Sequence, residues 1–212
     1  MLEADAAAQS RWAKAASRAE GLTDLGIGGA VRRYFLMYFP FTFLAGLVVG
    51  FALASIWPDV AEGFVPSGLY IGSLLSGLGV AVVGWVYGNK KVSRMVRPRR
   101  IGVTVGLTDE EVKHIRRQVL TKEPIDVSHI SVLRGAAVQI REGLAKQLLF
   151  SPGLLIYFAG QFLSRGIQSV IDVVMLVLLV GMVVLLAITS RQFHQTGEFL
   201  TSTYPSGSDN PK

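Results

Sequence analysis

Cysteine is absent from all 212 residues, and charged residues are scarce. The first absence excludes disulfides, thiolate nucleophiles and every zinc or iron–sulfur site that depends on cysteine. The scarcity of charged residues is more informative about the class of protein. Only 17% of the residues are Asp, Glu, Lys or Arg, whereas a soluble domain of this size carries about 25%. Half of the residues are hydrophobic, so lipid is expected to face much of the chain.

Two long segments contain no charged residue, 34–57 and 68–87. As helices they would rise about 36 Å and about 30 Å, enough to cross the hydrocarbon core of a bilayer. A third apolar segment, 148–163, is short, but it can span if it starts at 143 and Lys146 reaches back to the headgroups. A re-entrant segment is the alternative there. The fourth, 167–190, holds a single charge.

Three polar segments flank these runs: an Ala-rich start (1–33), a central region (89–147) and a tail (191–212). The start predicts a helix that ends at Gly21, lying on the membrane surface through Trp12, or else a loosely ordered tail. The tail ends in small polar residues, which predicts disorder.

The central region predicts two short helices. Thr108 and Glu111 have the spacing of a capping box, which predicts a helix from there to about Leu120. Pro124 interrupts the chain, and Asp126 or Ser128 can then cap a second helix that runs toward 146. We expect a cytoplasmic helical hairpin that packs on the membrane or on a partner.

The positive charges define an orientation. Of the 21 Lys and Arg residues, twenty fall in segments 1–33, 89–147 and 191–212, and one, Arg165, falls in a turn that would lie on the other side. The positive-inside rule therefore places both termini and the central region in the cytoplasm. The predicted fold class is all-α: a multi-pass protein of the inner or plasma membrane, with two transmembrane hairpins (34–88 and 148–190) joined by the cytoplasmic hairpin.

Asp172 is the residue most out of place, because a carboxylate inside an apolar helix costs free energy to insert. Gln168 lies four residues before it, and Gln161 and Arg165 have the same spacing across the turn. One hypothesis is an intramembrane polar site for an ion, a proton or a lipid headgroup. The alternative is a structural pair of Asp172 and Arg165 near the interface.

Small residues recur every fourth position in the first two spans. Such stripes let helix backbones approach closely in lipid. They predict packing between these two helices, and the extra stripe on the second span favours contact with a partner or a second copy. The stripes are Gly46, Gly50 and Ala54 in the first span, and Gly68, Gly72 and Ser76 beside Ser73, Gly77 and Ala81 in the second.

A run of basic residues without any acid follows the second span. In a juxtamembrane position this pattern is typical of contact with the phosphates of anionic phospholipid. Nucleic acid is not expected as a partner, because no aromatic residues are interleaved with the basic ones. The six residues are Lys90, Lys91, Arg94, Arg97, Arg99 and Arg100.

Catalytic signatures are absent from the sequence. The three histidines, His114, His129 and His194, do not have metal-ligand spacing, and no nucleophile motif or phosphate-binding loop is found. We therefore expect no enzyme activity, no cofactor and no metal.

The segments Leu-Thr-Asp-Glu-Glu at 107–111 and Lys-Glu-Pro-Ile-Asp at 122–126, followed by a helix and a transmembrane hairpin, resemble small membrane proteins of actinobacteria that have no assigned function. The resemblance covers roughly residues 107–195 and implies a bacterial inner membrane. Those proteins usually carry several arginines after the last span, whereas this chain has only Arg191 there.

The functional expectation is a non-enzymatic accessory or scaffold subunit of a larger membrane assembly, with a partner protein or a second copy of the chain. The alternative is a small transporter or channel for an ion, a proton or a solute that uses Asp172. A membrane-embedded lipid enzyme ranks third.

Overall fold

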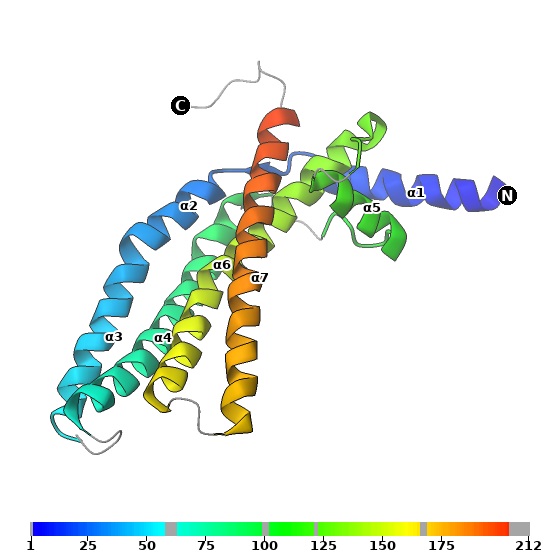
Figure 1. The fold of residues 1–212 in the computed structure, drawn as a ribbon. Helices are drawn as coiled ribbons and strands as arrows, with labels where there is room; N and C mark the ends of the chain where they lie inside the picture. The colour runs from blue at the N-terminus through cyan, green and yellow to red at the C-terminus, as the bar shows by residue number, and fades with distance from the viewer. Residues whose placement is uncertain (1, 58–62, 99–101, 121–122, 166–168, 204–212) are drawn as a thin grey trace. The chain divides into compact units, whose positions relative to one another are not determined.

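The structure is a computed structural model that describes residues 2–57, 63–98, 102–120, 123–165 and 169–203. It is mostly helical (Figure 1), as predicted. The chain divides into two compact units. Unit 1 comprises residues 1–27, 93–144 and 191–212, and unit 2 comprises residues 28–92 and 145–190.

Among the described residues, three helical stretches are long and apolar enough to cross a membrane: Ile27–Ala54, Phe64–Arg94 and Val170–Thr203. They overlap the predicted first, second and fourth spans. The first comprises α2 (Ile27–Arg33), η1 (Tyr34–Tyr38) and α3 (Phe39–Ala54), and the others contain α4 (Phe64–Lys90) and α7 (Val170–Thr203). The presence of helices able to cross a membrane is therefore confirmed. The predicted third span lies in α6 (Ile130–Arg165), which is not among these three.

The first helical stretch begins at Ile27, seven residues before the predicted start, and it is distorted at Pro40. The turn before this proline, η1, is a π-helix, and the amide of Phe39 donates to the carbonyl of Tyr34 five residues earlier. A proline ring clashes with the carbonyl four residues before it and offers no N–H, and such local disruption is relieved by a wider turn. Pro40 thus explains the π-helical turn in the first stretch.

In unit 2, helix α4 packs closely against α3 through small residues. A Cβ added at Gly46 would lie 2.5 Å from the backbone nitrogen of Ser76, and one added at Gly50 would overlap the backbone of Gly72. Gly68 faces the ring of Phe51 in the same way. Backbones this close leave no room for side chains, so the first stripe of α4 and that of α3 pack on each other.

The second stripe of α4 faces α6. A Cβ at Gly77 would lie 2.6 Å from the backbone nitrogen of Tyr157, and one at Gly84 would overlap the carbonyl oxygen of Leu149. A Cβ at Gly160 of α6 would overlap the side chain of Ser73. The two stripes of α4 therefore pack on two helices of the same chain.

Side-chain hydroxyl groups form hydrogen bonds between the first helical stretch, Ile27–Ala54, and α4. The Ser76 hydroxyl donates to the carbonyl of Phe43 at 2.7 Å, and the Tyr34 hydroxyl donates to that of Val80 at 3.1 Å. The Tyr87 hydroxyl donates to Ala30 O at 3.2 Å. Such hydrogen bonds stabilise helix association in lipid, where the hydrophobic effect contributes little to it.

Unit 1 contains α1 (Leu2–Ala19), α5 (Asp109–Val119), η4 (Val127–His129), the start of α6 and the end of α7. A short antiparallel ribbon joins β1 (Thr23–Asp24) to β2 (Val96–Arg97), which follows η3 (Val92–Arg94). The core of unit 1 is formed by buried aliphatic and aromatic side chains: Ala15, Ala19, Leu22, Val103, Ile115, Val119, Val132, Leu133, Phe199 and Leu200.

The predicted capping box at α5 is confirmed: the Thr108 side chain accepts from the amide of Glu111, and the Glu111 side chain accepts from the amide of Thr108. Helix α1 ends at Ala19, two residues before the predicted stop at Gly21, whose φ of +74° suits glycine. It packs within unit 1, with Arg11 bonded to Glu111 at 3.1 Å. A loosely ordered start is thus ruled out for this helix.

Two predictions need correction. The tail is helical to Thr203, because Phe193, Phe199 and Leu200 bury their side chains in unit 1, so predicted disorder is wrong for 191–203, while 204–212 lies outside the described residues. The ribbon β1–β2 departs from an all-α chain. Its strands of two residues each are too short to leave a sequence pattern.

Candidate functional site

Asp172, the leading candidate from the sequence, lies in the first turn of α7. Its carboxylate accepts hydrogen bonds from the amide of Ser169 at 2.7 Å and from the Ser169 hydroxyl at 2.8 Å. A carboxylate at the third position of a helix that bonds back to the preceding serine is the acidic half of a capping box. This contact gives Asp172 a helix-capping role, and the pair with Arg165 stays a prediction.

Of the other three members of the predicted polar site, the structure describes the side chain of Gln161 alone. Gln161 lies on α6 and is partly exposed. Gln168 and the side chain of Arg165 lie outside the described residues. The partner that the sequence analysis missed is Ser169, and the pattern Ser-x-x-Asp before an apolar run was the signal that could have found it.

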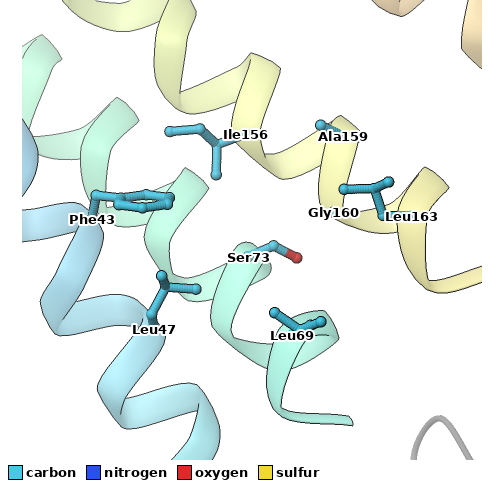
Figure 2. Close-up of a pocket in the computed structure, with 8 residues that line it drawn as sticks. All are labelled: Phe43, Leu47, Leu69, Ser73, Ile156, Ala159, Gly160 and Leu163. Carbon is cyan, nitrogen blue, oxygen red and sulfur yellow. The ribbon is translucent and has the colours of Figure 1, made fainter. Parts of the chain in front are cut away.

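Unit 2 contains an apolar cavity of about 330 Å³ between α3, α4 and α6 (Figure 2). Seven of its eight lining residues are apolar or glycine, and the eighth is Ser73, whose hydroxyl donates to the carbonyl of Tyr70 at 2.9 Å. The cavity therefore offers contacts for an acyl chain or an apolar side chain and no group suited to catalysis. The lining residues are Phe43, Leu47, Leu69, Ser73, Ile156, Ala159, Gly160 and Leu163.

The membrane part of α7 is the least buried of the three stretches. The buried share of the apolar window is 0% for Val170–Thr203, 6% for Ile27–Ala54 and 39% for Phe64–Arg94. Exposed side chains include Val173, Val174, Val177 and Leu178. The partly buried residues recur every three or four positions, so they share one face of the helix and the exposed surface covers the rest. They are Met175, Leu176, Leu179, Met182 and Leu186.

The predicted lipid contacts begin at the end of α4. Lys90 and Lys91 are exposed there, Arg94 ends η3, and Arg97 lies in β2 with an exposed side chain. Arg99 and Arg100 lie outside the described residues. Four of the six basic residues are thus exposed over eight consecutive positions.

Two carboxylates of unit 1 have altered acidity. The hydrogen bond from Arg11 lowers the pKa of Glu111 below its ordinary value. Hydrogen bonds from the Ser128 side chain, then from His129 and the Ser128 amide, lower the pKa of Asp126 to about 2. In both cases a donor stabilises the charged form. Both carboxylates also cap helical turns, which indicates a structural role.

Within the described residues, no group of three or more His, Asp or Glu side chains could hold a metal ion. His114 instead pairs with Glu123 at 2.7 Å and His129 with Asp126 at 2.8 Å. His194 lies in the helical tail beside Phe193. The histidines therefore lie in three separate local settings.

Comparison with protein-family models, curated proteins and solved structures finds no match to this chain. The resemblance to actinobacterial membrane proteins accordingly stays a prediction. The function has to be argued from the geometry of the chain itself.

Proposed function

We propose that this chain is a non-enzymatic scaffold subunit of a membrane assembly. In this role α7 binds the transmembrane helices of a partner protein, and unit 1 forms a folded platform on the cytoplasmic side of the bilayer. The inner membrane of a bacterium, which the resemblance implies, is the proposed location.

The observation that carries the proposal is the exposure of α7. This stretch is the least buried of the three, with none of its apolar window buried against 6% for Ile27–Ala54 and 39% for Phe64–Arg94. The small-residue stripes of α4, by contrast, are already occupied by α3 and α6. The predicted partner contact is therefore assigned to the exposed surface of α7, not to the stripes.

The proposal includes four spans, with α6 as the third to cross. Contacts between α4 and α6 extend from Ser73 with Gly160 to Gly88 with Lys146. This covers sixteen residues of α4, or about 22 Å along a helix. A re-entrant segment would pack over a shorter length, so this long antiparallel contact supports a full crossing. The lower hydropathy of α6 is consistent with a helix that packs on a neighbour along much of its length.

The orientation follows from the distribution of Lys and Arg, which favours cytoplasmic termini. With four spans, the three segments of unit 1 all lie on one side of the bilayer. Their joint core, built from α1, α5, α6 and α7, supports this arrangement.

Transport through Asp172 is not proposed, because its carboxylate caps α7 through Ser169. A route for an ion would also need polar side chains along several helices. The cavity between α3, α4 and α6 is instead lined by apolar residues.

Photo-cross-linking tests the scaffold function. Because the chain has no cysteine, single cysteines can carry a benzophenone at Val177 or Leu178 of α7 and, as matched controls, at Leu44 or Val48 of α3. The four positions have similar exposure, between 58% and 68%. Illumination in the native membrane should yield a discrete protein adduct of constant mass from α7 and only lipid adducts from α3.

The same adduct should appear in a stoichiometric complex when the protein is extracted in mild detergent and weighed by native mass spectrometry. Lipid adducts alone from all four positions, together with a monomer of 22.9 kDa, would refute the scaffold function.

A further inference from the structure

A second cavity lies in unit 1, next to the ribbon. It is a concave surface with a volume of about 470 Å³, lined by Ser93, Arg94, Val96, Arg97 and Pro98. Ser93 and Val96 are buried and form its base, whereas both arginine side chains are exposed. One short segment of chain therefore places two guanidinium groups at one hollow.

The positive charge of this pocket is not compensated nearby. Neither Arg94 nor Arg97 forms an ion pair within the described part of the chain, and no acidic residue occurs between positions 88 and 108. The acid closest in the ribbon is Asp24, which pairs with Val96 across the strands. Its carboxylate already bonds to Arg141 at 2.6 Å and to the amides of Gly26 and Ile27.

Covalent connectivity places the pocket at the membrane surface. Arg94 ends the stretch Phe64–Arg94 that is able to cross the bilayer, and Arg97 follows three residues later. Three residues reach at most about 11 Å, so Arg97 stays close to the end of this stretch. A guanidinium can donate two parallel hydrogen bonds to phosphate oxygens, which a lysine cannot do.

We propose that the pocket at Arg94 and Arg97 binds a phosphate group, supplied by the headgroup of an anionic phospholipid. The proposal does not depend on a partner for α7. It selects two of the six basic residues after α4 as a specific site and leaves Lys90 and Lys91 to act as diffuse charge.

Native mass spectrometry of the full chain, released from nanodiscs that contain phosphatidylglycerol and phosphatidylcholine in equal parts, tests the site. The wild type should retain one phosphatidylglycerol molecule in preference to phosphatidylcholine. Arg94→Gln with Arg97→Gln should reduce this preference by about tenfold, the effect of one lost charge-assisted contact. Lys90→Gln with Lys91→Gln removes the same charge from neighbouring positions and should reduce it less than about threefold.

Two more measurements make the result decisive. Lys113→Gln with Arg116→Gln, on the exposed face of α5, controls for net charge, and the melting temperature of each variant controls for folding. Titration with inorganic phosphate and with glycerol phosphate separates the sources: competition only at high millimolar concentration supports the lipid.

Displacement of the lipid by micromolar inorganic phosphate would overturn the assignment to a lipid. An equal loss of preference in the lysine pair and the arginine pair, or no preference in the wild type, would overturn the pocket. Tight binding of a short oligonucleotide at the same arginines would overturn it in favour of nucleic acid.

Discussion

The guanidinium of Arg141 lies 2.6 Å from the carboxylate of Asp24, although 117 residues separate them. The pair links the segment between α1 and α2 to helix α6 inside unit 1. Both side chains are largely buried, with 18% and 10% exposed. The other side of the guanidinium faces the ring of Phe193 at 5.0 Å, from the helical tail. Arg141, which lies on α6, therefore contacts two other segments of the chain.

Replacing Arg141 with methionine should destabilise unit 1 by about 3 kcal/mol, because it leaves a buried carboxylate without its partner. Asp24→Asn should cost a similar amount, and the double variant should cost clearly less than the sum. Unfolding of the protein in mild detergent, followed by limited proteolysis of unit 1, provides the measurement. Glu110→Gln is the control, because its contact with Lys113 at 4.0 Å is exposed. Additive losses would show that the pair has no coupling.

Gly84→Ala should destabilise unit 2 by about 1–3 kcal/mol, since the added methyl group overlaps the carbonyl oxygen of Leu149 and forces α4 from α6. Gly181→Ala is the matched control on α7, because nothing lies within 4 Å of its added Cβ. It should be neutral or stabilise the helix by up to about 1 kcal/mol. Titration with SDS in mixed micelles measures both. Equal effects at the two glycines would contradict the packing of α4 on α6.

The Asp126 carboxyl should titrate near pH 2, well below its ordinary value of 3.8. Because the folded pKa is lowered, its stabilising contribution is complete above about pH 4 and is lost as the pH falls toward 2. Ser128→Ala removes the largest cause and should move the midpoint back toward 3.8. Carbon-13 NMR of the labelled carboxyl group follows the titration. An unchanged midpoint in this variant would contradict the contact with Ser128.

Asp172→Asn and Ser169→Ala should each weaken the first turn of α7 by about 1 kcal/mol, as the loss of a helix cap does. Their effects should not add in full, because both variants act on the hydrogen bond that the Ser169 hydroxyl donates to Asp172. Hydrogen exchange of the amides in the first turn of α7 is the measurement. A flux of ions through the reconstituted wild type that Asp172→Asn abolishes would contradict the capping role and restore the transport hypothesis.

Much of the fold could be predicted because the bilayer restricts what an uncharged segment can do. Segments 34–57 and 68–87 had to be helices, since no other open structure satisfies its backbone in lipid. The capping box at Thr108 and the end of α1 near Gly21 were predictable for a similar reason: few residues suit those positions.

What could not be predicted depended on contacts between distant segments. The helical tail is ordered by the burial of Phe199 and Leu200 in unit 1, and the ribbon joins residues more than 70 positions apart. The role of the second stripe on α4 was also open, because Gly77 and Ala81 give no sign of which helix they face. At the candidate site, Asp172 was found by its charge, but its partner Ser169 was missed.

The central claim is that four helices cross the bilayer and that unit 1 lies in the cytoplasm. Single cysteines at Ser55, Lys113, Val170 and Ser202, in this cysteine-free chain, test it with a maleimide that does not cross membranes. All four positions are exposed. Intact cells should be labelled at positions 55 and 170, and positions 113 and 202 should react only after permeabilisation. Labelling of position 113 from outside, or of position 202 but not 170, would contradict the claim.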